Sequence, residues 1–201
     1  MSQVMTVESS EQTTKYKIFM AAAQLFSKRG YIGVSIRDIC EETGLSKPTI
    51  YYYFGNKEGI YKALVDTGIS LGENQSRAIL EKNIPIRQKL IELLQSAFQN
   101  TLDYPEFVKF FQNLFTLDEK LTFLDDVIRM ANERRQRVAE LIHEGMEKGE
   151  FGSSADPQLV SDVFVGTATH FIWKQLTSDE KILSDQLAED IIEFLFKGLN
   201  E

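Results

Sequence analysis

Residues 35–57 read SIRDICEETGLSKPTIYYYFGNK, and this stretch decides the fold of the N-terminal part of the chain. Ser35 and Asp38 have the spacing of a capping box, in which two side chains satisfy the free amides at the start of a helix. Gly44 predicts the end of that helix, because glycine readily adopts the left-handed conformation of a helix terminus. Ser46 is a favoured residue at the start of another helix. The stretch therefore predicts two short helices joined by a tight turn.

The second of these helices is predicted to have one face for packing and another for a partner. Ile50, Tyr53 and Phe54 follow the spacing of a helix face that points inward. The outward residues are Lys47, Pro48, Thr49, Tyr51 and Tyr52. Amino and hydroxyl groups suit phosphate oxygens, and the apolar atoms of proline and threonine suit a thymine methyl group. The pattern indicates a helix that enters the major groove of double-stranded DNA.

A further helix is predicted to begin at Asn56, whose side chain caps it, with Lys57 in its first turn. Free amides at the start of a helix attract anions, and a lysine beside them adds a positive charge. We therefore expect Lys57 to contact one more phosphate of the DNA backbone.

From about Tyr16 to Val65 the chain resembles the N-terminal domain of TetR-family transcriptional repressors. The matching pieces are AAAQLFSKRGYIGVSIRDIC, TGLSKPTIYYYF and NKEGIYKALV, whereas only the all-helical pattern and the length match beyond them. The resemblance implies DNA contacts at Arg37, Lys47, Pro48, Thr49, Tyr51, Tyr52 and Lys57. We place Ser35 in the same candidate set. Asp38 lies next to Arg37, and we expect it to compete with phosphate for the guanidinium.

Charge is distributed unevenly along the chain. The whole chain has a net charge of −8, which by itself argues against a nucleic-acid-binding protein. Between Lys15 and Asp66, eight positive side chains against five negative ones give +3, whereas the balance from Gly68 to the end is −9. The basic segment at 15–66 is attracted to DNA, while the acidic segment from residue 68 onward is repelled. This difference favours docking on DNA in one orientation.

Composition and periodicity predict an all-α fold of about nine helices. The 201 residues are 43% apolar and include only four prolines, as in a globular and mainly helical protein. We expect a disordered arm at 1–14, a three-helix helix-turn-helix DNA-binding domain at 15–60, and a larger helical domain for effector binding and dimerisation at 61–201. The first helix is expected from Lys15, and a long one at 119–148.

The sequence also bears on the cellular compartment. Cys40 is the single cysteine, so no disulfide forms within the chain, which is consistent with a reducing cytoplasm. No apolar run approaches the roughly 18 residues that span a bilayer. The first residues have neither a basic start nor an apolar core, so they do not form a signal peptide. We expect a cytoplasmic protein without a membrane partner.

The last two predicted helices, Pro157–Leu176 and Ser184–Leu199, carry broad apolar stripes. Candidate interface residues are Val160, Phe164, Thr167, Phe171, Ile191 and Leu195. One interpretation is a dimer interface of four helices, two from each chain; the other is the core of a single chain, and the pattern alone does not separate them. The resemblance and the two-fold recognition of DNA favour a homodimer whose heads read half-sites one helical turn apart on a palindromic operator.

Aromatic residues later in the chain suggest a pocket for a small-molecule effector. The candidates are Phe107, Phe110, Phe111, Phe123, His170 and Trp173. Ligand pockets are mostly apolar with a few polar groups, so an apolar or aromatic effector fits them. The same residue types also fill any helical core, and core packing is the favoured alternative for each of them.

The sequence lacks the motifs that catalysis and metal binding require. There is no phosphate-binding loop, no nucleophile elbow and no closely spaced set of metal ligands, so we predict no catalytic residue, metal or cofactor. The main hypothesis is a repressor that binds an operator as a dimer and is released by an effector. The alternatives are a helical protein-interaction module, which the net acidity favours, and an enzyme carried by the helical body.

Overall fold

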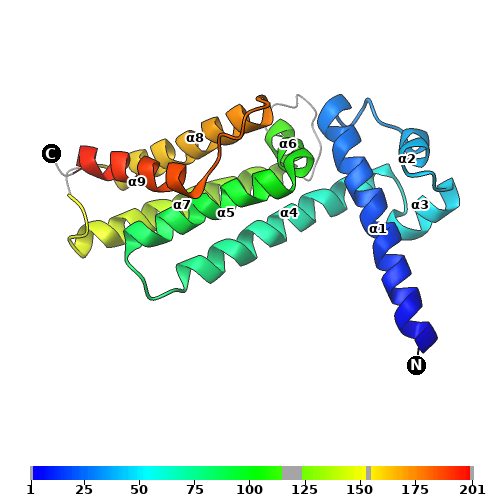
Figure 1. The fold of residues 1–201 in the computed structure, drawn as a ribbon, viewed down its shortest axis with the longest axis horizontal. Helices are drawn as coiled ribbons and strands as arrows, with labels where there is room; N and C mark the ends of the chain where they lie inside the picture. Colours follow the sequence, from blue (N-terminus) through cyan, green and yellow to red (C-terminus); the bar gives the residue numbers. More distant parts are fainter. Residues whose placement is uncertain (1, 115–123, 153–154, 200–201) are drawn as a thin grey trace. The chain divides into compact units, whose positions relative to one another are not determined.

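The structure, a computed structural model, describes residues 2–114, 124–152 and 155–199. Over these residues the chain forms nine α-helices and no strand, which confirms the predicted all-α fold (Figure 1). The helices are α1 (Ser2–Arg29), α2 (Ile36–Thr43), α3 (Lys47–Phe54), α4 (Lys57–Leu80), α5 (Ile86–Asp103), α6 (Pro105–Leu114), α7 (Leu124–Glu147), α8 (Pro157–Leu176) and α9 (Asp185–Leu199). Among the described helices, none is long and apolar enough to cross a membrane.

Local signals set most helix ends. Gly30 ends α1 with a φ of 67°, and the Asp156 side chain accepts a hydrogen bond of 3.0 Å from the amide of Gln158 at the start of α8. The first helix begins at Ser2 instead of Lys15 and runs through the segment that we expected to be a disordered arm. No proline or glycine precedes Gly30, so that segment contains neither of the two residues that most disfavour a helix.

The chain divides into two compact units, and helix α4 contributes to both. Unit 1 is Met1–Ser70 together with Glu106–Leu124, and unit 2 is Leu71–Pro105 together with Asp125–Glu201. From the sequence we placed the boundary between the two domains after residue 60. In the structure, unit 1 continues along α4 to Ser70 and also includes α6 from Glu106 onward.

Unit 1 is built around one apolar core that holds the two short helices α2 and α3 beside α1 (Figure 1). The core side chains include Ile18, Phe26, Ile39, Ile50, Tyr61, Leu64 and Phe110, none of them more than 2% exposed. Tyr61 of α4 lies against both Phe26 and Phe110, with ring centroids 4.9 and 5.0 Å apart. The short helices are therefore fixed by tertiary packing, which supplies most of the stability of helices of this length.

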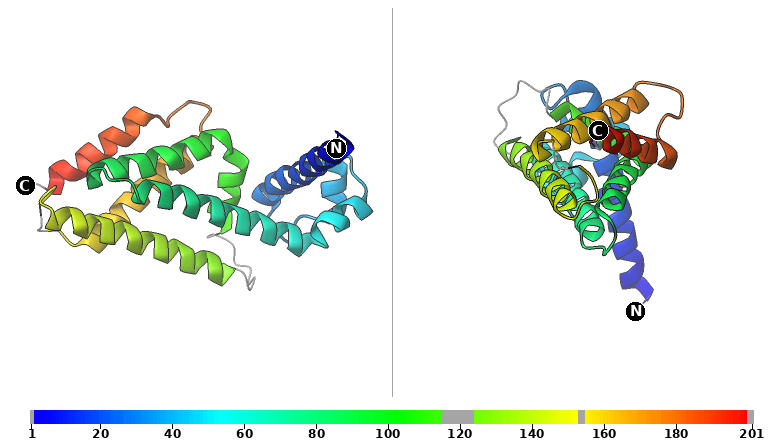
Figure 2. Two further views of the ribbon diagram at one scale, coloured as in Figure 1. Left: turned by 90° about the horizontal axis from the view of Figure 1, so that it is seen from below. Right: turned by 90° about the vertical axis from the view of Figure 1, so that its left-hand side faces the viewer.

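Unit 2 is a helical bundle in which α5 packs against α8 and α9 (Figure 2). Its core includes Leu90, Leu94 and Phe98 of α5. The carboxylate of Glu150 accepts hydrogen bonds from the backbone amides of Ile86 (2.7 Å) and Arg87 (3.4 Å) at the start of α5. These contacts satisfy amides that have no partner inside the helix.

Candidate nucleic-acid interface

Helix α2 begins with the capping box that the sequence predicted. The Ser35 hydroxyl accepts a hydrogen bond of 3.2 Å from the Asp38 amide, and the Asp38 carboxylate accepts one of 2.8 Å from the Ser35 amide. The hydrogen bonds from Ser35, and the nearby Arg29 guanidinium at 3.0 Å, hold the pKa of Asp38 below its usual value. The cap fixes the start of α2, so Ser35 has a structural role there.

A tight turn connects α2 to α3, as the sequence predicted. Gly44 has a φ of 68° and donates its amide hydrogen to the Cys40 carbonyl at 2.8 Å. The Ser46 hydroxyl then accepts from the Thr49 amide at 3.3 Å and lies 2.8 Å from the Thr49 hydroxyl. Ile50 is fully buried and anchors α3 on the core of unit 1.

We call the other side of α3 the recognition face: Lys47, Pro48, Tyr51 and Tyr52, which are exposed, and Thr49, which is partly buried. Tyr52 is 74% exposed and Tyr51 46% exposed. Lys47 forms no hydrogen bond or ion pair with any residue that the structure describes. The face therefore presents an unpaired cation, two phenols and the apolar atoms of a proline in the first two turns of one helix, a chemistry that fits phosphates and base edges.

Lys57 lies in the first turn of α4, as predicted, but most of its donor capacity is used inside the protein. Its ammonium donates to the carbonyl oxygens of Tyr31 (2.8 Å) and Val34 (2.9 Å) and lies 4.1 Å from the centroid of the Tyr31 ring. An ammonium has three donors, so one hydrogen is left for a phosphate. The sequence did not reveal this structural role, because both carbonyls belong to a turn more than twenty residues earlier.

Arg37 points into solvent and pairs with Glu41, one helical turn later, at 2.8 Å. Asp38, the competitor that we expected for Arg37, pairs with Arg29 instead. An exposed pair of this kind contributes little stability, so exchanging Glu41 for a phosphate is energetically cheap.

The described aromatic effector candidates are divided between the two units. Phe107, Phe110 and Phe111 pack with one another and with Phe19, Phe26 and Tyr61 in unit 1, and Phe110 is 1% exposed. His170 and Trp173 lie on α8 in unit 2, with rings 6.5 Å apart, and both are exposed. Phe123 lies outside the described residues. The core alternative therefore accounts for the phenylalanines of α6.

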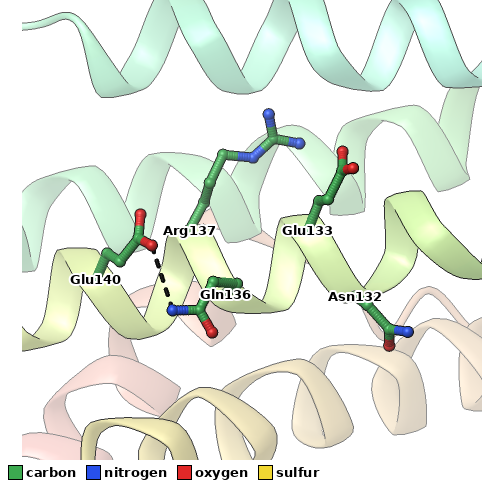
Figure 3. A pocket seen from close by; sticks show the side chains of 5 residues that line it. All are labelled: Asn132, Glu133, Gln136, Arg137 and Glu140. Atoms are coloured by element: carbon green, nitrogen blue, oxygen red, sulfur yellow. Dashed lines mark hydrogen bonds between the residues drawn. The ribbon is translucent and has the colours of Figure 1, made fainter.

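A pocket of about 500 Å³ lies along α7, lined by Asn132, Glu133, Gln136, Arg137 and Glu140 (Figure 3). Arg137 and Glu133 project from the same side of the helix, and Gln136 donates to Glu140 at 3.2 Å. All five lining residues are of polar or charged types and the pocket is open to solvent, and none of them is one of the aromatic candidates from the sequence.

The predicted interface residues of α8 and α9 fall into two groups. Val160, Phe164 and Ile191 lie in the core of unit 2, while Thr167, Phe171 and Leu195 are partly buried. The apolar side chains that remain exposed on these helices are Leu159, Val163, Trp173 and Phe194. Sequence periodicity predicted both helices. It did not predict which of their apolar residues are exposed, because the apolar stripe on each helix is wider than one packing face.

A known protein family matches the region that holds the recognition face. The profile of the family described as "Bacterial regulatory proteins, tetR family" matches residues 18–64. Over 60 residues the chain is 42% identical to an "Uncharacterized HTH-type transcriptional regulator in lacX 3'region" of Lactococcus lactis subsp. lactis. That match covers 30% of this chain and 31% of the relative, so it extends over about a third of the relative's length.

Two other matches cover nearly the whole chain at lower identity. The fatty acid metabolism regulator protein of Bacillus subtilis (strain 168) is 22% identical over 204 residues, covering 94% of this chain and 98% of the relative. The solved structure of AibR in complex with isovaleryl coenzyme A and operator DNA has a TM-score of 0.72 and 22% identity, covering 91% of this chain and 98% of AibR.

The fold and the matches agree with each other. The nine described helices, the capped α2–turn–α3 unit and the profile match at residues 18–64 all indicate the same type of protein. Residues 18–64 therefore belong to the TetR family of bacterial regulatory proteins, and the chain has the fold of solved TetR-family regulators.

Proposed function

We propose that this protein is a repressor that binds a near-palindromic operator as a homodimer and leaves it when a small molecule binds unit 2. The observation that carries the proposal is the recognition face of α3, where Lys47 has no partner among the described residues and Tyr52 is 74% exposed. Two copies of α3 in successive major grooves would read half-sites about one helical turn apart. DNA binding is assigned to residues 15–60, and effector binding and dimerisation to residues 61–201.

The proposed dimer uses the outward faces of α8 and α9. Leu159, Val163, Gly166 and Trp173 follow one another at helical spacing along one side of α8, and a Cβ added at Gly166 would meet no atom within 4 Å. Phe194 on α9 is 80% exposed, which is unusual for a phenylalanine. An isologous interface formed by this stripe would bury these side chains against their symmetry copies.

The proposed effector is an acyl compound. The Bacillus subtilis relative is named for fatty acid metabolism, and AibR was solved with isovaleryl coenzyme A. Both names agree with the apolar effector that the aromatic content of this chain suggested. An effector can release DNA only if it binds the conformation that does not fit DNA more tightly, and DNA then weakens effector binding by the same factor.

Helix α4 is the proposed link between effector and operator. Lys57–Ser70 belongs to unit 1 and Leu71–Leu80 to unit 2, so a displacement of this one helix reaches both. Lys57 ties the start of α4 to the turn before α2. A shift of α4 would therefore move α2 and α3, which include the recognition face.

The test is to select fragments of the source genome that bind the purified protein at about physiological salt, and to sequence them. We expect a palindrome with half-sites about one helical turn apart. The same selection with the variant Lys47→Ala should recover the palindrome more weakly. If no sequence is enriched, or only salt-sensitive binding to any DNA occurs, the proposal is wrong and the interaction-module alternative takes its place.

A further inference from the structure

A lysine lies at each end of α3. Lys47 is the first residue of the helix, and the ammonium of Lys15 on α1 lies 5.9 Å from the ring centroid of Phe54, the last residue of α3. Phe54 follows Lys47 by two helical turns, so the two residues lie in line along one side of α3. The Phe54 ring is partly buried, whereas Lys15 is exposed. Positive charge therefore stands at both ends of one side of α3.

Several other cations of unit 1 already have partners. Those that pair with a carboxylate, at 3.0, 2.8 and 2.8 Å, are Arg29, Arg37 and Lys62. Lys15, in contrast, forms no ion pair or hydrogen bond with any residue that the structure describes. A ring contact at an exposed site is weak, and it leaves the three N–H donors of the ammonium free. Lys15 can therefore bind an anion without giving up a partner.

The position of Lys15 on α1 differs from that of the other two lysines of this helix. Lys15 is three residues before the fully buried Ile18, so it lies at the edge of the side of α1 that packs on unit 1. Lys17 is turned by about 200° around the helix from Lys15, and Lys28 is about 20 Å further along the axis. Of the three, Lys15 is the one with a ring contact to α3.

The length of α3 fits the distance between the two rows of phosphates that border a major groove. Seven steps of about 1.5 Å separate the Cα atoms of Lys47 and Phe54 by about 10 Å. The major groove of B-DNA is about 12 Å wide. When α3 crosses the groove at an angle, its two ends point to opposite sides, and the lysine at each end reaches the phosphates of a different strand.

We propose that Lys15 binds a phosphate of the DNA backbone on the side of the major groove opposite to the phosphate bound by Lys47. The inference rests on the proposed function in one respect, namely that α3 enters the major groove. It extends the DNA-binding surface to α1, which none of the sequence motifs indicated. A phosphate contact carries no sequence information, so Lys15 contributes to binding of every duplex and fixes the position of α3 in the groove.

The first measurement is the salt dependence of binding of the full-length protein to a duplex of random sequence. Lys15→Gln should reduce the slope of log affinity against log salt concentration by about 0.9, and Lys15→Gln combined with Lys47→Ala by about 1.8, because the two phosphates are separate. Lys15→Arg should keep the wild-type slope, since it keeps the charge. The melting temperature of Lys15→Gln should stay within about 2 °C of the wild type.

The matched control is Lys17→Gln, which removes the same charge from the other side of α1 and should keep the wild-type slope. A second measurement locates the contact with uncharged methylphosphonate groups that replace the phosphates of the selected operator one at a time. One such replacement per half-site should weaken binding of the wild type but not of Lys15→Gln. It should lie on the strand opposite to the replacement that leaves Lys47→Ala unaffected.

The inference is overturned if Lys15→Gln keeps the wild-type slope, or if Lys17→Gln lowers the slope as much, which would indicate a diffuse effect of charge. It is also overturned if the replacements found with Lys15→Gln and Lys47→Ala lie on the same strand. A lower melting temperature with an unchanged slope would leave Lys15 only its contact with Phe54.

These outcomes are separate from failure of the proposed function. A selected palindrome together with an unchanged slope for Lys15→Gln keeps the repressor and rejects the contact. Failure to select any palindrome rejects the repressor, while the slope on random-sequence DNA still decides the role of Lys15. Absence of binding to any duplex rejects both.

Discussion

Helices α3 and α6 are both short, both rich in aromatic residues and both part of unit 1, yet they use those residues in opposite ways. Tyr52 of α3 is 74% exposed, whereas Phe110 of α6 is 1% exposed. A phenol keeps a polar group that water or a phosphate can satisfy, while a phenyl ring gains only by burial. Aromatic content alone therefore does not distinguish a binding face from a core.

The same contrast applies to two lysines that the sequence assigned to one role. Lys47 extends from α3 without a partner among the described residues, whereas Lys57 donates to two backbone carbonyls and lies over the Tyr31 ring. Both remain candidate phosphate contacts. Only Lys57 also ties α4 to the turn before α2, so the two lysines should respond differently to removal.

The largest effect is expected from Phe110→Ala. Removing a fully buried phenyl ring that contacts Phe26, Tyr61 and Phe111 should lower the free energy of unfolding by about 3–5 kcal/mol. The matched change Tyr52→Ala should alter it by less than about 0.5 kcal/mol and weaken operator binding instead. Urea unfolding measures the free energy of unfolding of both variants. Equal losses would contradict the conclusion that α6 uses its aromatic residues for the core and α3 for a binding face.

Lys57→Met should have the next largest effect. The change removes two hydrogen bonds from a charged donor to backbone carbonyls, and we expect a loss of about 2 kcal/mol in unfolding free energy. Lys62→Met, on the exposed side of the same helix, should cost less than about 0.5 kcal/mol. Thermal unfolding compares the stabilities of the two variants. If Lys57→Met is as stable as the wild type, the Lys57 ammonium does not stabilise the fold, and only a contact with DNA would remain as its role.

Lys47→Ala should leave stability unchanged and weaken binding to all DNA sequences by a similar factor. Loss of one phosphate contact should reduce the slope of log affinity against log salt concentration by about 1. Lys197→Ala, which removes the same charge from α9 in unit 2, is the control and should keep the wild-type slope. Equal slopes for Lys47→Ala and the wild type would exclude a phosphate contact at this residue.

The smallest effect concerns the cap of α2. The pKa of Asp38 is lowered by its hydrogen bonds to Ser35, so its ionised form stabilises the folded head above the ordinary pKa of about 4. That contribution is lost as the pH falls through the lowered pKa. The melting temperature of Asp38→Asn should therefore lie below that of the wild type at pH 7, with a gap that narrows below about pH 4. If the difference in melting temperature between Asp38→Asn and the wild type is the same at every pH, the ionised carboxylate of Asp38 does not stabilise the fold.

The sequence by itself determined the elements whose causes are local. The capping box at Ser35, the left-handed Gly44, the N-cap Ser46 and the start of α8 at Asp156 all depend on residues within four positions of one another. The inward Ile50 and the outward Lys47 and Tyr52 follow from the helical period once the ends of α3 are known. The all-α fold and the recognition face were therefore predictable.

Only the tertiary structure decided which residues face each other across long stretches of chain. Lys57 meets carbonyls that lie more than twenty residues away, and Phe110 meets Phe26 across more than eighty. Burial of Val160 and Ile191, and exposure of Phe194, depend on how α8 and α9 pack against α5. A periodic pattern gives the apolar faces of a helix but not its neighbour, because burial is non-directional and any apolar face satisfies it.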